Sequence, residues 1–162
     1  MKRNSFLRLV ITISASQLAG ILGSFFTVNA ISSWYVYLLR PAFAPPSWVF
    51  GPVWVTLFFL MGIAVWLVWE RGMRRQDVRV ALGIFLIQLG LNTLWSIVFF
   101  GLRNPGAAFI EILFLIIAIL ATMRAFYPIS RTATLLLVPY IAWVSFAAYL
   151  NWSIYQLNSL LT

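Results

Sequence analysis

The chain of 162 residues has no cysteine, no histidine and only three acidic residues. Without cysteine it forms no disulfide and carries out no thiol chemistry. Without histidine it lacks the commonest metal ligand and the commonest general base. The phosphate-binding loop, H-E-x-x-H, C-x-x-C and G-x-S-x-G motifs are also missing from the sequence. These absences argue against the enzyme classes that depend on those groups.

Apolar residues, by contrast, are abundant: 63% of the chain is hydrophobic and 9% is charged. An ordinary soluble domain is about 45–50% apolar and about 25% charged. A water-soluble fold of this length could not bury so much apolar surface. The composition therefore predicts an integral, multi-pass membrane protein, with membrane lipid covering its outer surface.

Five stretches are long and apolar enough to cross a bilayer, which requires about 20 residues of helix. They cover roughly residues 6–28, 48–69, 80–100, 105–126 and 132–155. The pair Asn104-Pro105 is a helix start signal, and Pro139 predicts a kink in the fifth stretch. The predicted fold is an all-α bundle of five transmembrane helices in a single domain, residues 1–162.

The net charge of +8 comes from arginine and lysine residues in the connections between these stretches. This scattered arrangement argues against nucleic-acid binding, which uses one basic patch. One side of the predicted bundle holds nine of the basic residues: Lys2, Arg3, Arg8, Arg71, Arg74, Arg75, Arg79, Arg124 and Arg131. The other side holds only Arg40 and Arg103. The asymmetry predicts a cytoplasmic N-terminus and an external C-terminus in a bacterial-type membrane.

The first connection, about residues 29–47, is long and contains several aromatic residues and prolines. A flexible tether would instead be rich in glycine and serine. Long ordered loops in compact domains are usually functional. We therefore expect an ordered lid over the external end of the bundle.

Uncommon polar and aromatic side chains gather between the midplane and this lid, judged from a helix rise of about 1.5 Å per residue. Two sets each form one stripe on a helix: Gln88, Asn92 and Trp95, and Trp143, Ala147 and Asn151. With Trp54 on the second helix, they predict an internal cavity floored by Gln17 and Gln88 and roofed by the first loop. Aromatic walls with few polar groups suit a flat, mostly apolar small molecule.

Several of these residues also have a purely structural interpretation. Gln88 and Asn92 are equally consistent with hydrogen bonds that join helices. Glu111, the one acid deep within a span, either stabilises the fold by pairing with another group or takes part in the function. Three tryptophans near helix ends fit an interfacial aromatic belt: Trp48, Trp69 and Trp152.

The first helix carries a stripe of small residues at four-residue spacing: Ser16, Gly20 and Ser24. Small residues at this spacing allow two helices to approach closely. The stripe therefore predicts either packing within the bundle or the seam of a homodimer.

Three segments of the sequence resemble the tryptophan-rich sensory protein family (TspO/MBR), which includes the mitochondrial translocator protein and peripheral-type benzodiazepine receptor. The first segment is R-P-A-F-A-P-P-S-W-V-F from Arg40, followed by P-V-W from Pro52. The second is Q-L-G-L-N-T-L-W-S from Gln88, and the third is P-Y-I-A-W-V-S-F-A from Pro139, followed by L-N-W from Leu150. In order and spacing they cover nearly the whole chain.

The resemblance implies a five-helix bundle, usually a homodimer, with a ligand pocket beneath the first loop. It implies porphyrins such as protoporphyrin IX, or a heme-like relative, and benzodiazepine-type drugs as ligands, with no cofactor required and no metal site. The candidate ligand-binding residues are Pro45, Pro46, Trp54, Gln88, Asn92, Trp95, Trp143, Ala147 and Asn151. The family's sterol motif needs a basic residue after Tyr155, and none follows here, which argues against sterol binding.

Three functions fit this sequence. The first is a membrane sensor or carrier that binds porphyrins and similar tetrapyrroles. The second is a light-dependent enzyme that degrades a bound porphyrin, with Trp54 and Trp143 as candidate redox-active residues. The third is a membrane scaffold whose pocket is incidental.

The charge asymmetry generates a topological prediction. A reporter fused after Thr162 should be found outside the membrane, and one inserted near Arg75 should be found in the cytoplasm. Protease accessibility of the two reporters in sealed vesicles measures this. A cytoplasmic reporter at the C-terminus would contradict the orientation.

Overall fold

The computed structural model describes residues 3–159. Five helices in this part of the chain are long and apolar enough to cross a membrane. The helical elements run in the order α1 (Arg3–Ser33), η1 (Tyr35–Tyr37), η2 (Ser47–Val49), α2 (Phe50–Trp69), α3 (Gln76–Ser96), η3 (Ile97–Gly101), α4 (Pro105–Phe126), α5 (Arg131–Leu136) and α6 (Val138–Asn158). The predicted all-α, five-helix membrane bundle is confirmed.

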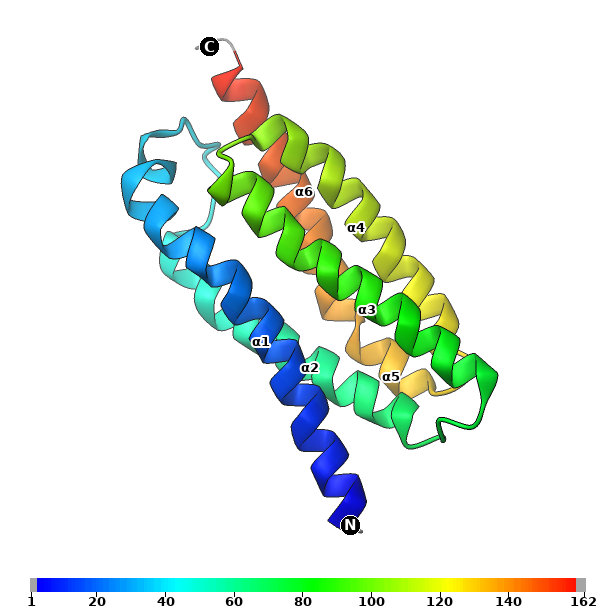
Figure 1. Cartoon of the computed structure of the whole chain (residues 1–162). Coiled ribbons are helices and arrows are strands. Elements are labelled where there is room, and N and C mark those ends of the chain that lie inside the picture. The colour runs from blue at the N-terminus through cyan, green and yellow to red at the C-terminus, as the bar shows by residue number, and fades with distance from the viewer. Residues whose placement is uncertain (1–2, 160–162) are drawn as a thin grey trace.

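The helices form a bundle in which α1 lies against α2 and α3, α3 against α4, and α4 against α6 (Figure 1). One end of the bundle carries the first loop and the C-terminal end of α6, and we call it the loop end. The opposite end carries the α2–α3 and α4–α5 connections and most of the arginines, and we call it the arginine end.

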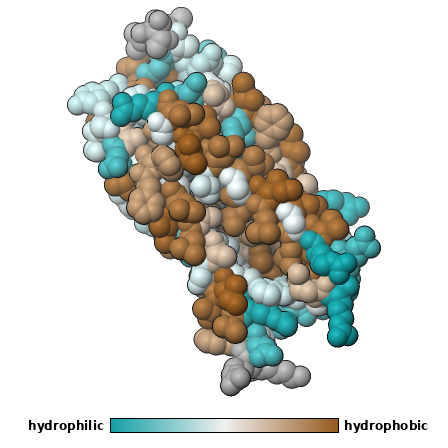
Figure 2. All heavy atoms as spheres, in the orientation of Figure 1, coloured by the Kyte–Doolittle hydropathy of each residue, from teal (hydrophilic) through white to brown (hydrophobic). Residues whose placement is uncertain are grey.

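Apolar side chains cover both the inside and the outside of the bundle. The core contains fully buried residues such as Met61, Val68 and Ile119. Large apolar residues such as Phe25, Ile87 and Ile117 are more than half exposed on the outer surface. Figure 2 shows a broad hydrophobic face with hydrophilic side chains gathered toward the two ends. A surface of this kind is stable only against hydrocarbon, so the chain is a multi-pass integral membrane protein.

Two helices differ in shape from their predicted stretches. α1 begins at Arg3 and extends to Ser33, beyond the predicted end near residue 28. The fifth stretch is divided into α5 and α6 at Leu137, because Pro139 has no N–H to continue the ladder. The break re-aims the chain, so that α5 packs beside α2 while α6 contacts α4.

α1 and α2 approach very closely from the middle of the bundle toward the arginine end. A Cβ atom added at Gly62 would lie 2.6 Å from the Cα atom of Ile13, and one added at Gly20 would lie 2.5 Å from the Phe58 ring. Ser16 on the same face of α1 is 1% exposed. The small residues Ser16 and Gly20 therefore pack inside the bundle, which is one of the two interpretations of their spacing.

The first loop is ordered by contacts with α6. The side chain of Asn158 accepts a hydrogen bond from the Leu39 backbone N–H at 3.1 Å and donates one to the Leu39 carbonyl at 3.0 Å. The Phe43 ring stacks on Tyr149 with ring centroids 5.1 Å apart. These contacts hold the loop across the end of the bundle.

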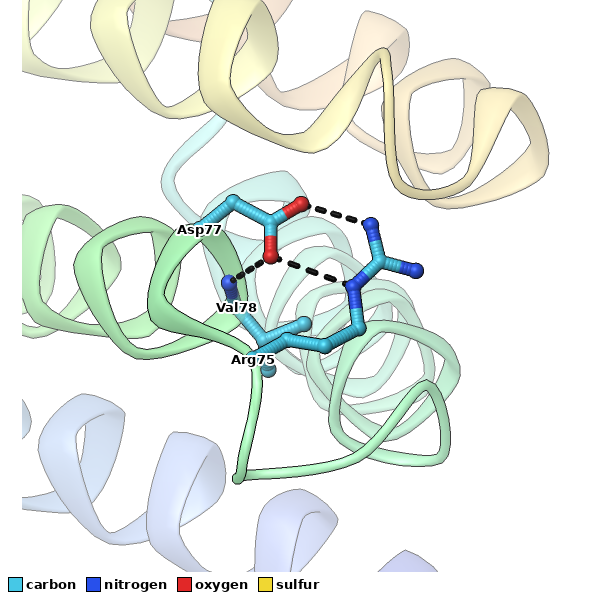
Figure 3. Close-up of polar contacts among 3 residues, drawn as sticks. All are labelled: Arg75, Asp77 and Val78. Atoms are coloured by element: carbon cyan, nitrogen blue, oxygen red, sulfur yellow. Dashed lines mark hydrogen bonds and ion pairs between the residues drawn. The ribbon is translucent and has the colours of Figure 1, made fainter.

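At the arginine end, two of the arginines are paired with acids. Arg75 forms a bidentate ion pair with Asp77 (Figure 3). The Asp77 carboxylate also accepts a hydrogen bond from the Val78 backbone N–H at the start of α3. Arg8 pairs with Glu70 at 3.1 Å and joins α1 to the end of α2. Among the residues whose side chains the structure describes, no acid partner is found at this end for the other five arginines: Arg71, Arg74, Arg79, Arg124 and Arg131.

The close approach at Gly62 predicts a large effect from a small substitution. Gly62→Ala would place a methyl group against the α1 backbone, and such overpacking typically costs about 1–3 kcal/mol. Thermal unfolding in one detergent should show a lower midpoint for this variant.

Gly83→Ala on α3 is the matched control when both variants are measured as detergent-solubilised monomers, because within one chain a Cβ atom there meets nothing within 4 Å. It should leave stability unchanged or raise it by up to about 1 kcal/mol, since alanine is the better helix former. Equal midpoints for the Gly62 variant and the wild type would contradict the close helix contact.

Candidate functional site

A cavity of about 410 Å³ lies in the loop-end half of the bundle. Its walls come from α1, α2, α3 and α6, and Tyr35 of the first loop contacts its upper end. Most lining side chains are aromatic or aliphatic. Ligand pockets typically measure about 300–1,000 Å³ and combine apolar walls with a few polar groups. The cavity falls within that range.

Three of the predicted tryptophans, one on each of three helices, line this cavity: Trp54 on α2, Trp95 on α3 and Trp143 on α6. Their rings are held by aromatic neighbours. Trp54 lies 5.6 Å from Phe58, and Trp95 stacks on Phe99 at 5.1 Å, both measured between ring centroids. The indole groups therefore present fixed apolar faces to the cavity.

Asn151 ties one of these indoles to two further helices. Its Oδ1 atom accepts a hydrogen bond from the Trp95 indole N–H at 3.1 Å, and its Nδ2 atom donates to the Pro105 carbonyl at 2.7 Å. α3, α4 and α6 meet through this one side chain. Asn151 and Ala147, one turn apart on α6, both line the cavity, and the small alanine side chain leaves the space open.

A second polar chain lies deeper and positions Asn92. The Asn92 Nδ2 atom donates to the Tyr140 hydroxyl at 3.0 Å, and that hydroxyl donates to Gln88 Oε1 at 2.9 Å. Gln88 Nε2 in turn approaches the sulfur of Met61 at 3.8 Å. Asn92 lines the cavity, whereas Tyr140 and Gln88 lie behind it.

Gln88 is therefore not part of the cavity floor, and that prediction is wrong. The sequence places Gln88 on the same helix stripe as Asn92, but it does not show that Tyr140 on α6 binds the Gln88 side chain away from the cavity. Gln17, the other predicted floor residue, does line the cavity, and its amide donates to the Val55 carbonyl at 3.0 Å.

Pro45 and Pro46 do not line the cavity either. They border a separate shallow depression on the loop. Pro46 is the extended residue immediately before η2, and the chain turns inward only after it. The residues of this motif that line the cavity are Ser47, Trp48 and Phe50.

Glu111 also lies outside the cavity. It is 9% exposed on α4, and neither of its carboxylate oxygens has a hydrogen-bond partner in the described part of the chain. It makes no ion pair with Arg103 or with any other described residue.

Sequence reasoning missed two contributions to the cavity. The first is Tyr35, whose hydroxyl is buried without a hydrogen-bond partner among residues 3–159. Burial raises the pKa of the Tyr35 phenol, against the opposing charge of Arg40, so the phenol stays protonated at neutral pH. The second is the pair of small α1 residues beyond Gln17, namely Gly20 and Ser24, which also line the cavity. Their spacing was the available signal, but it also fits helix packing.

The Asn92–Tyr140–Gln88 chain generates a stability prediction. Tyr140→Phe would remove the shared hydroxyl and leave two buried amide groups without a partner, which typically costs about 1–3 kcal/mol. Tyr149→Phe on the same helix is the control, because Tyr149 is 61% exposed and its hydroxyl makes no described bond to either amide. Thermal unfolding of both variants measures the difference. An equal loss of stability in the two variants would show that the Asn92–Tyr140–Gln88 hydrogen bonds contribute little to the stability of the protein.

Comparison with known protein families agrees with this geometry. The family model described as TspO/MBR matches residues 12–157. The chain is 46% identical to the tryptophan-rich protein TspO of Archaeoglobus fulgidus over 155 residues, covering 96% of this chain and 99% of that protein.

Two further relatives come from distant organisms. The translocator protein of Homo sapiens is 40% identical over 145 residues, covering 89% of this chain and 86% of that protein. The tryptophan-rich sensory protein of Cereibacter sphaeroides is 37% identical over 125 residues, covering 77% of each chain. With a family match over most of its length and relatives of this similarity, the chain belongs to the TspO/MBR family.

Proposed function

We propose that this membrane protein binds a flat, largely apolar tetrapyrrole, such as protoporphyrin IX or a heme-like relative, in the cavity beneath its first loop. The observation that carries the proposal is the convergence of Trp54, Trp95 and Trp143 on one cavity with few polar groups. Indole faces stack well on flat aromatic rings. Benzodiazepine-type drugs share this flat apolar character and are expected to compete for the same cavity.

The polar groups would orient the ligand. Asn92 and Asn151 line the cavity and are each held by hydrogen bonds to neighbouring helices. An amide offers both a donor and an acceptor to a polar ligand edge. Gln88 would act behind Asn92 as a positioning residue, and Pro45 and Pro46 would shape the loop that covers the site. Binding requires no metal or other cofactor in this proposal.

The proposed binding suits a sensor or a carrier, and light-dependent degradation of the bound porphyrin is the second candidate function. The observation behind the second candidate is that two oxidisable indoles, Trp54 and Trp143, form walls of the same cavity. Product analysis after illumination of a porphyrin complex separates the two roles. Unchanged porphyrin supports binding alone, and ring-opened products that disappear in a Trp54/Trp143 double variant support degradation.

We further propose a homodimer in a bacterial-type membrane, with the loop end outside. α3 offers a seam, because Gly83 and Gly90 lie on its exposed side and have no neighbour within 4 Å of an added Cβ atom. Two exposed glycines two turns apart on one face leave room for a second helix to approach, since small residues favour close helix contact in membranes. The equivalent contact of Gly20 on α1 is already occupied by Phe58 of the same chain.

The binding proposal predicts the effect of removing one indole at a time. Stacking is worth roughly 0.5–1.5 kcal/mol per aromatic pair beyond area burial, so Trp54→Phe and Trp143→Phe should each weaken porphyrin binding by roughly three- to tenfold. A protoporphyrin IX titration of each folded variant in detergent measures this.

Trp66→Phe is the control, because Trp66 lies toward the arginine end of α2 and bonds to the Ser5 carbonyl rather than lining the cavity. Its affinity should match the wild type. Equal losses in all three variants would place the binding site outside the cavity.

A further inference from the structure

Six of the residues that line the cavity are also exposed on the outside of the bundle. They are Ile21, Ser24 and Val28 on α1, and Trp48, Gly51 and Val55 on η2 and α2. Each set of three has the spacing i, i+3 and i+7, which places it along one side of its helix. All other lining residues are buried or half-buried. The rim of the cavity is therefore formed by two facing helix edges.

The two edges face each other in antiparallel register. Farther toward the arginine end, Gly62 meets Ile13. When the antiparallel pairing is continued from this contact toward the loop end, Ile21 falls opposite Val55. Ser24 then falls opposite Gly51, and Val28 opposite Trp48. The two smallest residues thus lie at the middle of the rim, and an added Cβ atom at Gly51 would meet nothing within 4 Å. No side chain therefore fills the space in front of Gly51 at this level.

The remaining sides of the cavity are closed. Toward the arginine end, Gly20 packs on Phe58 and the fully buried Met61 lies below. At the loop end, Asn158 holds Leu39 through two hydrogen bonds, and Tyr35 is 4% exposed beneath the loop. The gap between α1 and α2 is therefore the open side, and it lies within the hydrophobic spans of both helices.

We infer that apolar ligands enter and leave this cavity sideways from the bilayer, between α1 and α2 at Ser24 and Gly51, in the leaflet on the loop side. The inference rests on the proposed binding function. A flat apolar molecule partitions into the hydrocarbon of the bilayer before it meets the protein. A gap that opens to the bilayer is therefore exposed to the ligand at its concentration in the membrane. Because the cavity is closed toward the arginine end, the ligand returns to the leaflet from which it came.

The first test adds bulk to the gap. Ser24→Phe and Gly51→Phe should each slow the association and the dissociation of protoporphyrin IX by about tenfold, equivalent to about 1.4 kcal/mol of added barrier, with a smaller change in equilibrium affinity. Stopped-flow quenching of tryptophan fluorescence in lipid nanodiscs measures both rates. Ala107→Phe is the matched control, because it adds a phenyl ring to an exposed site near the loop end of α4.

The second test closes the gap reversibly, which the absence of native cysteine makes possible. In the Ser24→Cys/Gly51→Cys variant, bridging with a reducible bifunctional thiol reagent should prevent protoporphyrin IX from binding. Bridging after loading should trap the bound porphyrin, and reduction should restore both rates. A single-cysteine variant treated with the same reagent controls for simple modification.

The alternative route passes beneath the first loop. Asn158→Ala removes both hydrogen bonds to Leu39 and should leave the association rate unchanged if access is lateral. Faster association in this variant, together with unchanged rates in the Phe and bridged variants, would overturn the inference. An unmodified protein that fails to bind protoporphyrin IX in an equilibrium titration would instead overturn the proposed function, so the two failures are distinguishable.

Discussion

The structure depends on one constraint: inside hydrocarbon, every polar group must find its partner within the protein. In the loop-end half, two short hydrogen-bonded chains meet this constraint for the buried amides, whereas Glu111 has no partner among residues 3–159. The first chain runs from Asn92 through Tyr140 to Gln88 and joins α3 to α6. The second runs from Trp95 through Asn151 to the Pro105 carbonyl and joins α3, α6 and α4. Both chains end at side chains that line the cavity. The groups that hold the helices together are thus the same groups that would orient a ligand.

Helix packing explains why the cavity lies in only one half of the bundle. Toward the arginine end, Gly62 lies against the Ile13 backbone, and Gly20 packs against Phe58 at the near boundary of the cavity. Toward the loop end the contacting residues give way to the small residues Ser24 and Gly51, and the same two helices no longer fill the space between them. Small residues therefore have opposite effects at two levels of this helix pair. Gly62 lets α1 and α2 approach closely toward the arginine end, and Ser24 and Gly51 leave space between them toward the loop end.

Much of this arrangement could be predicted from the sequence, because hydrocarbon imposes strong rules on composition. The five spans follow from apolar length, and the gathering of Trp54, Asn92 and Trp143 follows from helix periodicity and depth. The positions of Gln88 and Pro46 could not be predicted in the same way. Whether Gln88 reaches the cavity depends on the Tyr140 ring from another helix, and the direction of the proline rings depends on the backbone that leads into η2. Periodicity fixes the face of a helix but not what a neighbouring element places in front of it.

The central claim is that the cavity between these helices holds a flat tetrapyrrole against the indole groups of α2 and α6. The most direct measurement is a crystal structure of the full-length protein with protoporphyrin IX. The account predicts electron density for the macrocycle inside the cavity, in contact with Trp54 and Trp143, with a polar edge near Asn92. A porphyrin bound on the loop surface or between two protomers, with the cavity unchanged, would contradict it.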